Sequence, residues 1–113
     1  MWYVGVFLAW GVTAAQDTQG LYRTTNRGKS WDRIWAGHNV ESATIDPSNP
    51  ARMFVTTESD GLWSTTNLNT TAPTFVADPD FPFFHPLRVF FNPNVPGEAW
   101  VVNFGGGMQV RQF

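Results

Sequence analysis

The sequence contains no cysteine, and only 14% of its 113 residues are charged. Without cysteine, neither a disulfide framework nor a thiolate metal site can form. The seven lysine and arginine residues are scattered and the net charge is −2. A nucleic acid or an anionic membrane surface requires clustered positive charge, so neither is expected as a partner. No apolar run is long enough to span a bilayer as a helix.

Aromatic residues and turn formers are abundant. The chain has six Trp, ten Phe, eight Pro and ten Gly. This aromatic content argues against disorder, and the proline and glycine content requires many turns. Together with the frequent Val and Thr, the composition predicts an all-β, antiparallel fold.

Two internal repeats set the organisation of the chain. Residues 20–26, Gly-Leu-Tyr-Arg-Thr-Thr-Asn, recur at 61–67 as Gly-Leu-Trp-Ser-Thr-Thr-Asn, 41 positions later (61 − 20). Residues 46–50, Asp-Pro-Ser-Asn-Pro, recur at 92–96 as Asn-Pro-Asn-Val-Pro, 46 positions later (92 − 46). Periods of about 40–50 residues are typical of β-propeller blades. We therefore predict four-stranded antiparallel blades, about two to two and a half of them in this chain.

Short apolar segments between these turns are the expected strands. We predict them near residues 2–6, 20–25, 31–35, 42–46, 52–57, 61–66, 87–91 and 99–104. Pro47, Pro50, Pro93 and Pro96 are expected in turns, where a missing N–H disrupts no strand pairing.

The first residues allow two interpretations. The apolar segment 1–15 ends in small residues like a signal peptide, but no Lys or Arg precedes Arg23. The repeat favours a buried strand at 2–6 instead, so that the chain begins in the middle of a blade. The whole chain, 1–113, is then a partial propeller with blade pieces at roughly 1–35, 40–78 and 86–113.

One turn carries a recognisable motif. Residues 24–31 read Thr-Thr-Asn-Arg-Gly-Lys-Ser-Trp. We expect Asn26 to accept bonds from N–H groups of its own turn, Gly28 to supply a positive φ, and Trp31 to be largely buried. The segment resembles the Asp-box, Ser-x-Asp-x-Gly-x-Thr-Trp, of the sialidase-type repeat propellers. The matching positions are Thr24, Asn26, Gly28, Ser30 and Trp31. A degenerate second copy runs from Asn67 to Phe75.

The resemblance implies a fold more than an activity, because such boxes are structural in the family. With the Pro-containing turns, it is closest to xyloglucanase-like glycoside hydrolases and to sortilin-like propellers. It implies a C-terminal fragment of an extracellular or periplasmic protein whose partners are its remaining blades and a polysaccharide. The alternatives are a non-enzymatic, sortilin-like protein-binding or peptide-binding propeller, and a short chain that assembles with itself into a ring.

No residue set in the sequence specifies a reaction. Glycoside hydrolysis requires two carboxylates at a suitable separation, and no pair among the nine acidic residues is convincing. Asp17 is the least unsuitable single acid. Asp46 and Asp60 are expected to stabilise turns. No catalytic residue, cofactor or metal ligand is therefore assigned. His38 and His85 lack a second ligand at metal spacing and are expected to be solvated or hydrogen-bonded in loops.

Aromatic residues in the long connections are the candidates for binding. Trp10 and Trp35 are the candidate platforms for stacking on a sugar ring. The alternative for both, and for Phe81, Phe83 and Phe84, is that they cover interfaces between blades, which are rich in aromatic residues.

Overall fold

The computed structural model describes residues 1–8 and 17–113, and every regular element in these ranges is a β-strand. The strands are β1 (Trp2–Val6), β2 (Gly20–Thr24), β3 (Asp32–Ala36), β4 (Val40–Asp46), β5 (Asn49–Thr57), β6 (Leu62–Thr65), β7 (Val76–Ala77), β8 (Pro86–Phe91), β9 (Glu98–Asn103) and β10 (Gly107–Gln112). All strand pairings are antiparallel, so the predicted all-β antiparallel class is confirmed. Within the described ranges no helix is long and apolar enough to cross a membrane.

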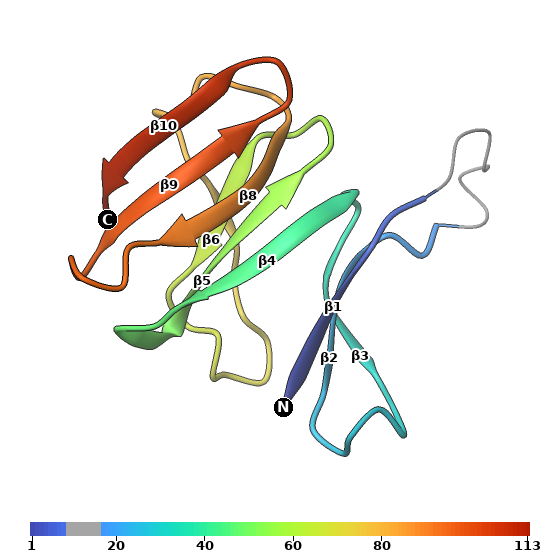
Figure 1. Cartoon of the computed structure of the whole chain (residues 1–113). Coiled ribbons are helices and arrows are strands. Elements are labelled where there is room, and N and C mark those ends of the chain that lie inside the picture. The colour runs from blue at the N-terminus through green and yellow to red at the C-terminus, as the bar shows by residue number, and fades with distance from the viewer. Residues whose placement is uncertain (9–16) are drawn as a thin grey trace.

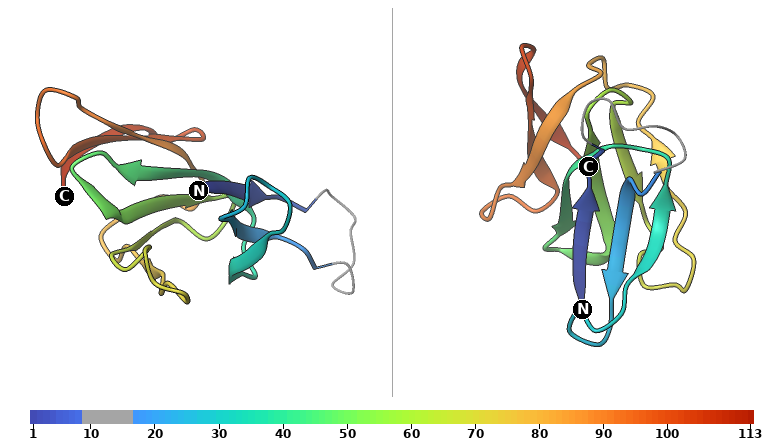
Figure 2. Two further views of the ribbon diagram at one scale, coloured as in Figure 1. Left: turned by 90° about the horizontal axis from the view of Figure 1, so that it is seen from below. Right: turned by 90° about the vertical axis from the view of Figure 1, so that its right-hand side faces the viewer.

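The strands form three separate sheets that follow one another along the chain (Figure 1). The N-terminal sheet has the order β1-β2-β3, the central sheet β4-β5-β6-β7, and the C-terminal sheet β10-β9-β8. The central sheet lies between the other two, and Figure 2 shows the three sheets from two further sides. Short connections between sequential strands explain why each sheet is built from neighbouring segments.

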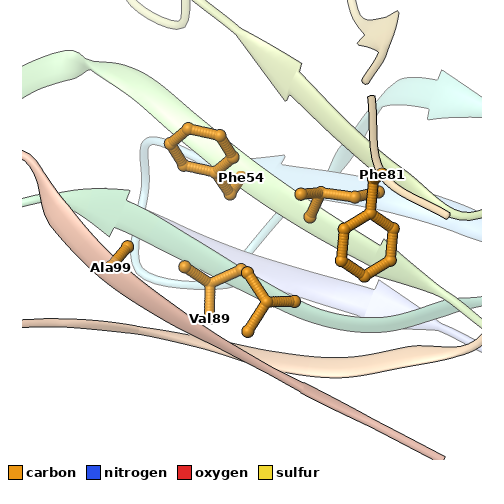
Figure 3. Close-up of a cluster of buried hydrophobic side chains, with 6 residues drawn as sticks. Phe54, Phe81, Val89 and Ala99 are labelled. Carbon is orange, nitrogen blue, oxygen red and sulfur yellow. The ribbon is translucent and has the colours of Figure 1, made fainter. Parts of the chain in front are cut away.

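The two faces of the central sheet support two different cores, because successive side chains of a strand point to opposite faces. Met53 and Val55 of β5 face the N-terminal sheet, and Phe54 between them faces the C-terminal sheet. The first core contains Leu21, Val40, Met53, Val55 and Leu68. The second contains Phe54, Leu62, Phe81, Val89, Ala99 and Val101 (Figure 3).

Hydrogen bonds also cross both junctions between sheets. The buried side chain of Arg23 in β2 donates to the carbonyl oxygens of Leu68, Thr70 and Thr71, at 3.0, 2.9 and 3.0 Å. On the other side, the Thr56 hydroxyl donates to the carbonyl of Leu87 at 3.0 Å. These bonds satisfy polar groups that would otherwise be buried without partners, and they fix how the sheets lie against each other.

The central and C-terminal sheets repeat the same strand register. The β8–β9 pairs are the β4–β5 pairs shifted by 46 positions (86 − 40). Val40↔Thr57 corresponds to Pro86↔Asn103, and so on to Ile45↔Met53, which corresponds to Phe91↔Ala99. The same shift converts every β5–β6 pair into a β9–β10 pair. Even the β-bulge between Val40 and Ser42 recurs, between Pro86 and Arg88. The two sheets are therefore structural repeats with the period seen in the sequence.

The N-terminal sheet follows the same scheme. Its β1–β2 pairs, from Trp2↔Thr24 to Gly5↔Leu21, correspond to the β5–β6 pairs from Met53↔Thr65 to Thr56↔Leu62. The offset is 51 on the first strand (53 − 2) and 41 on the second (65 − 24), so the connection between β1 and β2 is ten residues longer. The strand predicted at 2–6 is therefore present as β1, and its pairing with β2 agrees with the repeat. The expectation that this strand is buried is wrong, because Trp2 and Val4 are 54% and 43% exposed on the face that no other described sheet covers.

The eight predicted strands are all present, with bounds shifted by up to three residues, and two more were missed. β7 has only two residues, which is too short to give a pattern. β10 places Met108 and Val110 on the exposed face and Gln109 and Arg111 on the inner face, which inverts the usual alternation.

The prediction that Pro50 lies in a turn is wrong. Pro50 belongs to β5, but the register shifts between the Asp46↔Asn49 and Ile45↔Met53 pairs. Pro50 therefore lies in the irregular stretch, where its missing N–H breaks no pairing bond.

Truncating a core side chain at either junction should destabilise the protein strongly. Leu21→Ala and Leu62→Ala each remove a fully buried side chain and should each cost about 2–5 kcal/mol of unfolding free energy. The control Val76→Ala, at an exposed position, should change it by less than about 0.5 kcal/mol. Denaturant titration followed by tryptophan fluorescence measures all three, and equal losses for Val76 and either leucine would contradict the two-core description.

Candidate functional site

The 24–31 turn is closed by side chains of its own residues. Asn26 Oδ1 accepts from the Ser30 N–H at 3.0 Å and from the Thr24 hydroxyl at 2.9 Å, and Asn26 Nδ2 donates to Ser30 Oγ at 2.7 Å. Arg27 and Gly28 have φ of 60° and 84°. The expectations for Asn26 and Gly28 are thus confirmed. The side chains of Thr24, Asn26 and Ser30 bond to one another and to the backbone of the turn, so these three residues have a structural role.

The turn between β6 and β7 uses the same bonds although its sequence differs. Asn67 Oδ1 accepts from the Thr65 hydroxyl at 2.7 Å and from the Thr74 N–H at 2.9 Å. Thr74 therefore takes the place of Ser30 in a loop three residues longer, and Phe75 follows it as Trp31 follows Ser30. This agrees with the degenerate second copy of the motif that the sequence indicates from Asn67 to Phe75.

The prediction that Trp31 is largely buried is wrong, since its side chain is 38% exposed. Phe75, at the equivalent position, packs against Trp35 of the neighbouring sheet, with ring centroids 5.2 Å apart. Trp31 lies on the face of the N-terminal sheet that has no sheet against it. A Cβ placed on Gly28 would lie 3.6 Å from both the Trp2 and Trp31 rings, so these two rings flank the turn on that face.

Asp46 serves its turn, as expected. Its Oδ1 accepts from the N–H and hydroxyl of Ser48 at 2.8 and 2.7 Å, and its Oδ2 accepts from Arg52 Nε at 2.9 Å. Burial raises the pKa of this carboxyl, but the two Ser48 bonds and the Arg52 charge together hold the pKa below its usual value. Asn92 repeats the turn bond, accepting from the Asn94 N–H at 2.9 Å.

These turns all lie at one end of the sheets, and Trp35, Phe83 and Phe84 lie at the other. We call this second end the aromatic end; it includes His38, Asp60, His85 and Phe104. Leu8 N–H donates to Asn39 Oδ1 at 2.9 Å, and Gly61 N–H donates to the Phe84 carbonyl at 2.9 Å. These bonds join the three sheets at the aromatic end.

The first cluster at this end surrounds Trp35. The His38 imidazole stacks on the Trp35 indole, with centroids 4.2 Å apart and planes 13° apart, and its Nδ1 lies 2.8 Å from Asp60 Oδ2. Trp63 packs beside both rings and donates its Nε1–H to the Asp60 carbonyl at 2.9 Å. His38 is thus hydrogen-bonded in its loop, as expected. With His38 and Phe75 against it, the Trp35 ring packs the junction between two sheets, so a sugar would have to displace the imidazole to stack on it.

The second cluster is an open cleft of about 440 Å³ between the β7–β8 connection and the β9–β10 turn. His85 Nε2 lies 2.7 Å from Glu41 Oε1, and the Phe104 ring lies 5.1 Å from the imidazole. Phe84 and Phe104 are 78% and 74% exposed, which leaves their rings open to solvent. We call this group the His85 cleft; its lining residues are Pro82, Phe83, Phe84, His85, Phe104, Gly105 and Gly106.

Gly106 makes room for an aromatic wall of this cleft. A Cβ at this position would lie 2.8 Å from the Phe83 ring, closer than atoms can approach. Phe83 in turn packs edge-on against buried Phe81, so both serve the junction of the two sheets.

Sequence reasoning missed the partnership of Glu41, His85 and Phe104. The repeat could have indicated that His85 and Phe104 lie together, because they are 46 positions after Asn39 and Glu58. The same backbone bond joins both pairs, Glu58 N–H to the Asn39 carbonyl at 3.0 Å and Phe104 N–H to the His85 carbonyl at 2.9 Å.

The remaining candidates have structural contacts or lie outside the described residues. Asp17, the least unsuitable acid in the sequence, forms a surface pair with Arg33 at 3.8 Å. In residues 1–8 and 17–113 no three His, Asp or Glu side chains are grouped to hold a metal ion. Trp10 lies outside the described residues, so its proposed stacking role stays a prediction.

Comparison with known proteins found no match to this chain among family models, curated proteins or solved structures.

Removing the asparagine that closes each turn should weaken folding measurably. Asn26→Ala and Asn67→Ala each delete an acceptor of a turn N–H and should each cost about 1 kcal/mol. The matched control is Asn69→Ala, on the exposed surface of the same β6–β7 turn as Asn67. If denaturant titration shows the three variants to be equally stable, the turns do not depend on these side chains.

Asp46 should make stability depend on acid pH. Because the pKa of Asp46 is lower in the folded chain, its contribution is complete above the unfolded value, about 4, and is lost as pH falls through the folded value. Asp46→Asn lacks this contribution, so the wild type should be the more stable at pH 7 and its advantage should shrink at low pH. Denaturation at a series of pH values tests this, and a constant difference between the two proteins would refute it.

Proposed function

We propose that the three sheets are consecutive blades of a β-propeller of the sialidase-type Asp-box kind, and that its aromatic end binds a polysaccharide. The observation that carries the first part is the 46-residue recurrence of the strand register, bulge included. Repeats of one sheet each, packed face to face, are how propellers are built. The proposed blade pieces, 1–35, 40–78 and 86–113, each enclose one sheet to within a residue.

The two turns with shared hydrogen bonds support the Asp-box part of the proposal. Asn26 and Asn67 make the same contacts on loops of different length, and both turns join third and fourth strands of the repeat. This supports a position for the box on the rim, away from the aromatic end.

The His85 cleft supports the binding part. Exposed rings such as Phe84 and Phe104 offer flat apolar surfaces for the C–H faces of a sugar ring, and the adjoining His85–Glu41 pair supplies polar partners for hydroxyl groups. The cleft lies beside the junction of two repeats, since His85 contacts Glu41 of the central sheet, and its mix of aromatic walls with a few polar groups is typical of ligand sites. On this proposal the propeller is extracellular or periplasmic and glycan-active, and this chain contributes binding surface but no complete catalytic site.

Affinity electrophoresis in gels containing xyloglucan tests the binding proposal. The chain should be retarded, and Phe104→Ala or Phe84→Ala should weaken retention about tenfold, equal to about 1.4 kcal/mol. The control Val76→Ala changes an exposed side chain on the edge strand β7 and should bind like the wild type.

Three outcomes would contradict parts of the proposal. A chain that is retarded by no polysaccharide, xyloglucan or other, is not a glycan-binding module. Retardation that survives both phenylalanine substitutions assigns binding to another surface. Capture of peptides through the same two rings would instead favour the sortilin-like alternative.

A further inference from the structure

The outer face of the C-terminal sheet is apolar and uncovered. Four side chains on it are between 39% and 56% exposed, and we call them the C-face: Phe90, Trp100, Met108 and Val110. They form one surface, because Phe90 pairs with Trp100, and Trp100 with Val110, across adjacent strands. Exposed apolar patches of this kind are typical of interaction surfaces.

The repeat identifies what the C-face is built to contact. Its residues lie 46 positions after Thr44, Phe54, Leu62 and Ser64 of the central sheet. Within that set, Phe54 and Leu62 are buried against Val89, Ala99 and Val101 of the next sheet. The C-face is therefore the equivalent of a face that packs on another sheet within this chain.

The N-terminal sheet exposes the opposite kind of face. Trp2, Val4 and Trp31 are between 38% and 54% exposed, and we call them the N-face. They correspond to Met53, Val55 and Phe75 of the central sheet. Those three residues face the N-terminal sheet, two of them fully buried in the first core and Phe75 packed against it. The N-face is thus the equivalent of the face that receives a preceding sheet.

Both junctions in the chain pair these two kinds of face. At the first, Tyr3 and Leu21 of the N-terminal sheet pack on the Met53 and Val55 face of the central sheet. At the second, the Phe54 face packs on the equivalent of the Val55 face in the C-terminal sheet. One face of each kind is left over, the C-face and the N-face, and the two are complementary by the same rule.

We propose that a second copy of this chain covers the C-face with its N-face, and that the reciprocal contact closes a two-copy ring. The contact is head-to-tail, so it closes into a ring or continues as a filament. Two copies of three sheets give six, which lies within the range of about four to eight that closed propellers contain. The inference rests on the repeat of the proposed blades and is independent of carbohydrate binding.

Light scattering after size exclusion tests the ring directly. The wild type should have twice the 12.7 kDa mass of one chain. Val4→Asp on the N-face and Trp100→Asp on the C-face should each halve the measured mass, because a carboxylate would be buried in the contact. Val76→Asp is the matched control, since it makes the same change at an exposed position away from both faces, and it should leave the mass unchanged.

A mixture of the two variants distinguishes head-to-tail pairing from other modes. The Val4→Asp copy keeps its C-face and the Trp100→Asp copy keeps its N-face, so the mixture should regain a two-copy species at concentrations well above the wild-type midpoint. This recovery also shows that both variants are folded.

Each other result overturns the inference. A wild-type monomer means that no copy covers the C-face, and masses extending beyond two copies exclude the closed ring. If only one of the two substitutions dissociates the wild-type species, the face that carries that substitution pairs with itself and the other face takes no part in the contact. A mixture that stays monomeric shows that the two faces do not meet. None of these results bears on glycan retardation, so failure here and failure of the binding proposal are separate.

Discussion

Burial of both faces of the central sheet is the interaction on which the rest of the structure depends. Along β5 the side chains alternate between the two cores, so Met53 and Val55 hold the N-terminal sheet and Phe54 holds the C-terminal sheet. A sheet of three or four short strands has too little core of its own to be stable, and repeats of this size depend on stacked neighbours. Each outer sheet has one face that no other described sheet covers, which explains why apolar side chains such as Val4 and Trp100 are exposed there.

The two ends of the sheets are specialised in different ways. At one end, Asn26, Asp46, Asn67 and Asn92 close turns with their own side chains, and the same bonds recur from sheet to sheet. At the aromatic end the equivalent positions differ, with Asn39 and Glu58 in one repeat replaced by His85 and Phe104 in the next. A constant end maintains the scaffold, while a variable end can acquire binding surface without disturbing the strand pairing.

Polar contacts at the junctions add orientation to this apolar packing. Arg23 reaches three carbonyl groups of the β6–β7 turn, and Thr56 reaches the Leu87 carbonyl at the bulge in β8. Each bond is satisfied only when adjacent sheets lie in one register relative to each other. The His85 cleft lies beside this second junction: its lining residues belong to the β7–β8 connection and the β9–β10 turn, and His85 also contacts Glu41 of the central sheet.

The sequence by itself determined most of the strands and turns and the repeat, because these follow from local patterns. Short apolar segments such as 52–57 mark strands, proline and asparagine mark turns, and similar segments recur 41 and 46 positions apart. It could not determine which face of each sheet is covered, since that depends on contacts between distant residues. Trp31 and Phe75 occupy equivalent positions, yet only Phe75 has a neighbouring sheet to pack on. For the same reason β10 was missed, because its apolar residues point outward. His85 and Glu41 are 44 residues apart in the sequence, and only the packing of two sheets brings them together.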